Sequence, residues 1–352
     1  MNRVHGGTVG PGTNAPEPTG VATMSSHPST PSPRPGWAWV RLLAGAAVLA
    51  LVVVRIGAGP FLDGVRLTTT WSLAAATAVT ALTTLCCAWR WQVVADRLGV
   101  RIGLRTAVAS VYQAQFLNST LPGGVLGDVH RAARHAHGRG LSAPGVRSVV
   151  WERTVGQVVS VVLTLLILVA LPSPVHAIGV SGATLAVLFG VAALAALWSV
   201  RVLRGAPARV ARGLLADARV LLARRRHRWA LLATSAGALG GHLVVLLLAA
   251  HVAGVPASTV QLLPLAALVL LAAAVPANVA GWGPREGVAA WCFGAAGLGV
   301  ESGVTTAVAY GVMALVATLP GAVLLLAGGR PRRVLVPDAR PRRVPAEEAC
   351  CG

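Results

Sequence analysis

Hydrophobic residues in this chain are grouped into long runs that are separated by short polar connections. Six of the runs are each close to the roughly 20 residues that a helix needs to cross a bilayer. They occupy residues 37–56, 71–89, 149–171, 178–200, 229–252 and 303–327. Tryptophans stand at the ends of several runs, as is typical of a membrane–water interface. The pattern therefore predicts six membrane-spanning helices.

Two further apolar segments are broken by glycine and proline. Residues 104–121 run into LPGGVLGD, and residues 262–275 run into PANVAGWGPRE, which is followed by a short apolar piece at 287–299. Helix breaks at membrane depth are tolerated where protein shields the backbone from lipid. We therefore predict an all-α integral membrane protein with six full spans and two re-entrant, broken helical hairpins.

The order span, span, hairpin, span occurs twice, over residues 37–171 and 178–327. The two breaks share the spacing P-x4-G-x3-R. The matching residues are Pro122, Gly127 and Arg131 in the first break and Pro276, Gly281 and Arg285 in the second. Inverted repeats with broken helices at equivalent positions are typical of transporters, whose sites lie where the breaks meet. Chance is the alternative, because glycine and proline are frequent in this chain.

The ends of the chain differ from its middle. Residues 1–36 are rich in Pro, Gly, Ser and Thr, which predicts a disordered tail. Residues 329–352 are basic and broken by prolines, which predicts a second tail at the surface or beside the membrane. The polytopic membrane domain accordingly spans residues 37–328.

Composition agrees with a membrane protein and argues against a soluble enzyme. Hydrophobic residues make up 55% of the chain and charged residues only 12%, against about 25% charged in soluble domains. The net charge of +19 comes from 30 arginines, with no lysine, against 11 acidic residues. The arginines lie between the apolar runs, which indicates a positive-inside membrane protein rather than a nucleic-acid partner. We expect a multi-pass plasma-membrane protein with both termini in the cytoplasm.

Candidate chemistry is concentrated at the two breaks. In the first, glycines lead into a helix that carries Asp128 and Arg131 on one face, and a helix start with an added arginine suits a phosphate. In the second, Gly281 and Gly283 precede Pro284, Arg285 and Glu286. Ionisable groups within a membrane are functional candidates by default. The alternatives are cytoplasmic anchoring for the first break and a simple helix cap for the second.

Three other features leave more than one interpretation open. Glu152 and Arg153 begin a span, either as an interfacial anchor or as part of a cavity that faces Asp128. His242 lies in an apolar run, where a packing hydrogen bond is the more frequent role. No nucleophile, nucleotide-binding or metal-binding motif is present, so neither enzyme activity nor a cofactor is predicted.

Three ordered motifs resemble a known family. FLNSTLPGGVLGDVHR, WERTVGQV and VPANVAGWGPREG are similar to the flippase-like transmembrane domain of lysylphosphatidylglycerol synthases, also called YbhN-like or UPF0104 proteins when they stand alone. The family pattern falls on Asn118, Leu121, Pro122, Gly127, Asp128, Arg131, Glu152, Arg153, Gly281, Gly283, Arg285 and Glu286. Leu126 and Ala280 depart from it, each where the family often has glycine.

The resemblance implies a protein that handles lipid without aminoacylating it, because only a short tail follows the last apolar run. As a hypothesis, Arg131 and Arg285 hold the headgroup of an anionic or amino-modified lipid that is then flipped, while Asp128 and Glu286 orient the two arginines. The expected partners are a membrane phospholipid or lipid-linked substrate and a separate lipid-modifying enzyme. The alternative is an accessory or scaffold that does not transport and that serves a lipid-modifying or glycan-assembly enzyme.

Overall fold

The computed structural model describes residues 57–121, 124–136, 142–171, 216–275 and 282–327, with residues 43, 50, 53 and 54 in addition. All of them belong to the unit Gly36–Gly352. Within these ranges the regular elements are helices. This agrees with the predicted all-α class.

Among the described residues, four helices are long and apolar enough to cross a membrane. They are α3 (Thr70–Arg97), α6 (Ser142–Ala170), α10 (Arg225–Val252) and α13 (Val300–Ala327). Each matches one predicted span. The other two predicted spans, 37–56 and 178–200, lie outside the described residues, so the total of six stays a prediction.

The helix α3 is longer than its apolar run suggested. It begins at a capping box in which the Thr69 and Ser72 side chains each accept from the other's backbone N–H. The run was expected to end at residue 89, yet the helix continues to Arg97 because Trp91, Val94 and Ala95 extend its buried face. Arg90 is therefore inside the protein and not in a polar connection, which corrects the boundary taken from the sequence.

The helix breaks fall where the glycines and prolines predicted them. The first separates α4 (Leu104–Thr120) from α5 (Leu126–Ala136), and the second separates α11 (Thr259–Ala273) from α12 (Pro284–Ala295). At the first break α5 packs directly on α4, since a Cβ on Gly127 would overlap the Ala114 carbonyl. That these pairs re-enter the membrane remains a prediction.

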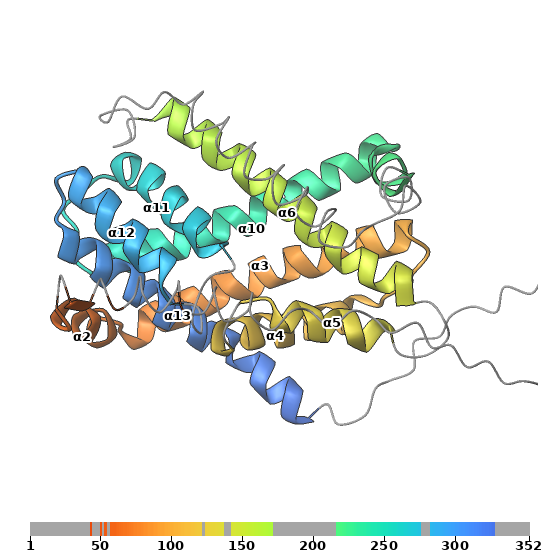
Figure 1. Cartoon of the computed structure of the whole chain (residues 1–352), viewed down its shortest axis with the longest axis horizontal. Helices are drawn as coiled ribbons and strands as arrows, with labels where there is room; N and C mark the ends of the chain where they lie inside the picture. Colours follow the sequence, from red (N-terminus) through yellow and green to blue (C-terminus); the bar gives the residue numbers. More distant parts are fainter. Residues whose placement is uncertain are drawn as a thin grey trace, which may run out of the picture. The chain divides into compact units, whose positions relative to one another are not determined.

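The packing of the two halves is matched pair by pair (Figure 1). The helix α3 packs on α10, α4 contacts α3, α5 and α13, and α11 contacts α10, α12 and α6. The helix α5 packs on α6 as α12 packs on α13. Each of these contacts has a counterpart when α3, α4, α5 and α6 are exchanged with α10, α11, α12 and α13. This correspondence supports the repeat hypothesis.

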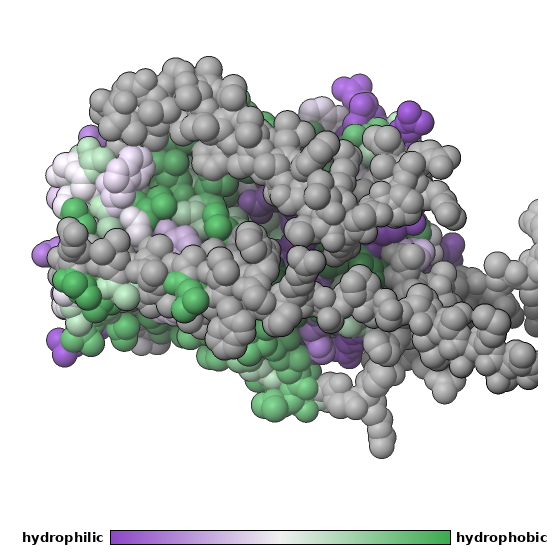
Figure 2. All heavy atoms as spheres, viewed as in Figure 1, coloured by the Kyte–Doolittle hydropathy of each residue, from purple (hydrophilic) through white to green (hydrophobic). Residues whose placement is uncertain are grey.

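Apolar side chains form both the core and much of the described surface. The largest buried cluster joins α10, α11, α12 and α13, with Leu246, Leu265, Phe293 and Met313 among its members. Figure 2 shows a green, apolar surface over the C-terminal half of α13, where Leu319, Val323 and Leu326 are exposed. Exposed apolar residues on a spanning helix are expected to face lipid.

We predict that Gly303→Ala lowers the thermal unfolding midpoint in detergent. A Cβ on Gly303 would overlap the Ala289 carbonyl and press α13 away from α12, and overpacking of this kind costs about 1–3 kcal/mol. The matched control is Gly240→Ala, where a Cβ meets nothing within 4 Å and the midpoint should hold or rise. Equal midpoints for the two variants would contradict the close packing.

Candidate functional site

The Asn118 side chain, in the last turn of α4, stabilises the first break by two hydrogen bonds. Its Nδ2 donates to Asp128 Oδ2 at 3.1 Å, and its Oδ1 accepts from the Gly127 backbone N–H at 2.8 Å. One side chain thus satisfies the first turn of α5 and fixes the Asp128 carboxylate. Asn118, Gly127 and Asp128 are thus brought together, while Pro122 lies outside the described residues.

Asp128 belongs to a chain of alternating charges that we call the first charge cluster. Glu152 on α6 lies 2.6 Å from Arg90 of α3 through Oε1 and 2.6 Å from Arg131 of α5 through Oε2. Asp128 lies 3.3 Å from Arg131 and 2.8 Å from Arg153. Three guanidinium groups therefore share two carboxylates, which leaves one positive charge.

The inner part of this cluster is closed to solvent. The Arg131 and Glu152 side chains are each 1% exposed, and the Arg131 guanidinium stacks over the Trp91 ring at 4.6 Å. Arg90 also donates to Ser235 of α10. A Cβ on residue 156 would contact the Arg90 guanidinium at 2.7 Å, so Gly156 gives the guanidinium room. The Arg131 guanidinium is thus occupied by Asp128, Glu152 and Trp91 and does not face a ligand.

Arg153 differs from its neighbours because it faces open space. Its side chain is 47% exposed although it is bound to Asp128 by two hydrogen bonds, from Nε at 2.9 Å and from Nη2 at 2.8 Å. It lines a cavity of about 240 Å³ that we call the α6–α10 cavity.

The α6–α10 cavity carries a polar stripe along α6. Arg153, Gln157, Ser160 and Thr164 recur at helical spacing and all line it. Among the described residues, the side chains of Gln157, Ser160 and Thr164 have no hydrogen-bonding partner. Leucines and alanines of α10 and α11 form the opposite wall. The cavity therefore offers polar groups on one side and an apolar surface on the other.

The second break forms a separate charge pair. Glu286 accepts from the Gly283 backbone N–H at 2.7 Å and from Arg285 Nε at 2.8 Å. Gly283 has a φ of +127°, which strongly favours glycine at this turn. Both charged side chains are buried. Gly281 lies outside the described residues.

Aromatic residues connect this second pair to the cavity. The Arg285 guanidinium lies 5.2 Å from the Trp282 ring and 5.4 Å from the Tyr310 ring. The Tyr310 hydroxyl is 3.2 Å from His242 Nδ1, and both of these residues line the α6–α10 cavity. Residues tied to both breaks thus meet in one cavity, although Arg131 and Arg285 themselves stay behind its walls.

Several of these residues were not expected from the sequence. Arg90 was assigned to a connection, His242 to packing, and the α6 polar stripe beyond Arg153 was not singled out. The available signals were an ionisable residue between two tryptophans and a polar residue at every turn of an apolar run. The His242 interpretation is supported in part, because its partner is the Tyr310 hydroxyl. Within the described ranges no three His, Cys, Asp or Glu side chains gather as metal ligands.

A family model described as the transmembrane (TM) region of lysylphosphatidylglycerol synthase matches residues 38–321. The chain belongs to this family. The match includes both charge clusters and the whole α6–α10 cavity, and it confirms the resemblance seen in the three motifs. Membership makes the protein a membrane protein of a family connected with lipid modification and flipping. A comparison with curated proteins gave no match.

We predict that Glu152→Gln is far more destabilising than Arg153→Gln. The first change leaves Arg90 and Arg131 without their shared carboxylate in a buried site, which costs about 3–5 kcal/mol. The second removes a half-exposed cation and should cost about 0–1 kcal/mol. Denaturant unfolding in detergent micelles measures both.

Glu301→Gln is the matched control for Glu152→Gln. Glu301 is exposed in the first turn of α13, so its loss should change the free energy of unfolding by only about 0.5 kcal/mol. A Glu152→Gln protein as stable as Glu301→Gln would show that the carboxylate does not hold the three helices together.

Proposed function

We propose that this protein binds a lipid with an anionic or amino-modified headgroup in the α6–α10 cavity and transfers it between leaflets. The observation that carries the proposal is the exposed guanidinium of Arg153 at the start of a polar stripe inside a membrane domain. An intramembrane charge that lines a cavity marks a substrate pathway.

The charge of the site favours a phosphate. Among the described residues, the first charge cluster has one more arginine than it has carboxylates. Arg90 and Arg153 both line the cavity, and Arg153 is the more exposed of the two. Arginine pairs with phosphate through two parallel hydrogen bonds, and such a pair is stronger where water is scarce. Gln157 and Ser160 can then bind further oxygens of the headgroup.

Arg131 and Arg285 take a different role from the one first expected for them. Each is buried against a carboxylate and over an aromatic ring, so we assign them to positioning. Arg131 holds Asp128 and Glu152, which in turn hold Arg153 and Arg90. Arg285 holds Tyr310 beside the cavity.

Asp128 gives the same site a way to accept an amine. Its Oδ1 atom is shared by Arg131 and Arg153. An ammonium group on a headgroup would compete with Arg153 for this carboxylate, while the lipid phosphate would compensate the released guanidinium. An aminoacylated phospholipid carries both groups.

The packing beside the two breaks supports movement between leaflets. The α6–α10 cavity lies open between α6 and the end of α11. The equivalent contact of α4 with α13 is closed in its part next to the first break, where Gly321 packs on the Tyr112 backbone and Ser119 approaches Thr318 at 3.4 Å. Rocking of inverted repeats opens one such contact as it closes the other.

Two measurements on the full-length protein test the proposal. Native mass spectrometry compares co-purified phospholipid, and proteoliposomes measure the transfer of a headgroup-labelled phosphatidylglycerol. Arg153→Gln should retain lipid about tenfold less well, since it removes a charge-assisted contact. It should slow transfer while leaving the unfolding midpoint nearly unchanged.

Arg228→Gln serves as the control, because Arg228 is an exposed arginine at the start of α10 that does not line the cavity. Lipid retention and transfer equal in all three proteins would contradict the proposal. Retention that depends on Arg153 without any transfer by the wild type would favour the accessory or scaffold role.

A further inference from the structure

A second hollow of the protein lies apart from the α6–α10 cavity. It has a volume of about 860 Å³ and is bordered by α3, the first half of α4 and the C-terminal part of α13. We call it the α4–α13 groove. It shares no lining residue with the α6–α10 cavity, so nothing in the proposed headgroup site explains it.

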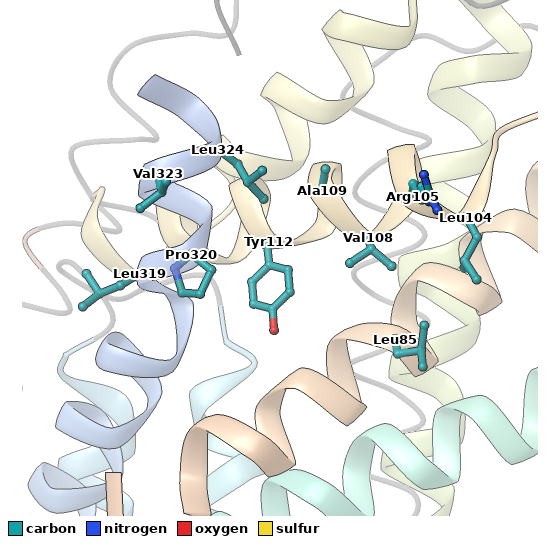
Figure 3. Close-up of a pocket in the computed structure, with 10 residues that line it drawn as sticks. All are labelled: Leu85, Leu104, Arg105, Val108, Ala109, Tyr112, Leu319, Pro320, Val323 and Leu324. Atoms are coloured by element: carbon teal, nitrogen blue, oxygen red, sulfur yellow. The ribbon is translucent and has the colours of Figure 1, made fainter. Parts of the chain in front are cut away.

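The lining of the α4–α13 groove is apolar along nearly its whole length. Figure 3 shows Val108 and Ala109 of α4 between Arg105 and Tyr112, with Leu319 and Val323 of α13 beyond Tyr112. Leu85 of α3 closes another side. Several of these side chains are exposed, including Leu85 at 42% and Val323 at 65%. A partner of the groove must therefore present an apolar surface to it.

One end of the groove is cationic. Arg105 lies in the first turn of α4, is exposed, and has no carboxylate within ion-pair distance among the described residues. The N-cap residue Gly103 makes no side-chain cap, so the first N–H groups of α4 are left for another acceptor. An unpaired arginine beside the positive end of a helix is complementary to an anion.

The backbone of α13 maintains the groove. Pro320 stands within the helix, and Gly321 brings α13 onto the Tyr112 carbonyl of α4. This close approach fixes α13 against α4 at one point. The Tyr112 ring points into the space beside that point (Figure 3). The hollow is thus a consequence of the same contact that holds the two helices together.

We propose that the α4–α13 groove binds a phospholipid with an anionic headgroup, with an acyl chain along the apolar lining and the phosphate on Arg105. The volume lies within the roughly 300–1,000 Å³ of ligand sites. Because α3 and α13 are long and apolar enough to cross a membrane, we expect the groove to face the lipid of the bilayer. This lipid would be a structural lipid, distinct from the lipid that is transferred through the α6–α10 cavity.

The charge at the groove's end favours a lipid over a helix from a second copy. An apolar helix placed along Val108 and Leu319 would bury Arg105 without an anion, and burying an unpaired charge is costly. A phospholipid satisfies the apolar groove and the arginine with one molecule. Arg105 would then sit at the headgroup level, where the positive-inside pattern also places the connection before α4.

Photolabelling of the full-length protein in vesicles tests this site. The probe is phosphatidylglycerol with a diazirine in its acyl chain, and a phosphatidylcholine with the same chains is its zwitterionic counterpart. In the wild type, peptide mapping should find adducts on 104–112 and 319–324, with more from phosphatidylglycerol. Arg105→Gln should lower the phosphatidylglycerol adducts about tenfold, to the level of phosphatidylcholine.

Substitutions that fill the groove separate a built site from general contact with the bilayer. Ala109→Trp and, independently, Val323→Trp should abolish adducts at both peptides for both lipids. Thr106→Trp, an exposed neighbour that does not line the groove, and Arg101→Gln, an exposed arginine before α4, should leave labelling unchanged.

Three results would overturn the proposal. They are equal labelling by the two lipids in the wild type, equal loss in Arg101→Gln and Arg105→Gln, and a groove-filling variant that alters the oligomeric state but not the labelling. Arg153→Gln should keep full labelling of the groove. A failure of the α6–α10 headgroup site is therefore distinguishable from a failure of this one.

Discussion

The structure depends on one buried carboxylate. Glu152 accepts from Arg90 on α3 and from Arg131 on α5, and Arg90 reaches Ser235 on α10. Three helices therefore meet at a single acid that is 1% exposed, and α10 is joined to them through Arg90. In a low-dielectric interior, charges without partners cost several kcal/mol each. The helices must adopt the one arrangement that pairs them, and that arrangement holds the first break against α6.

The first charge cluster and the Arg285–Glu286 pair are built in a similar way from different residues. Each places a buried arginine between a carboxylate and an aromatic ring, Trp91 for Arg131 and Trp282 for Arg285. Each relies on glycine where a Cβ would overlap its neighbour, at Gly156 beside Arg90 and at Gly311 beside Arg285. Arg131 and Arg285 are thereby kept inside the protein, while Arg90 and the more exposed Arg153 line the α6–α10 cavity.

The two proposed lipid sites lie in different parts of the protein and share no lining residue. The α6–α10 cavity combines a polar stripe with an apolar wall, whereas the α4–α13 groove is apolar with one cationic end. Both occur where a helix beside a break packs against a long span of the other half. Next to the second break, α6 and α11 are separated by the α6–α10 cavity. Next to the first break, α4 and α13 are in direct contact. A protein of two similar halves can thus hold lipid in two different ways.

The sequence by itself determined the helical class, the four described candidate spans, both helix breaks and the family motifs. Long apolar runs, glycine and proline are local signals that act within one helix length. It also predicted that Asp128 and Arg131 share a face. Only the tertiary structure decided which arginines are exposed. Arg131 and Arg285 turn to internal carboxylates, Arg90 joins them from a helix longer than its apolar run, and Arg153 lines the cavity. The pairing of a buried charge is set by which helices pack together, and these partners lie up to 145 residues apart in the chain.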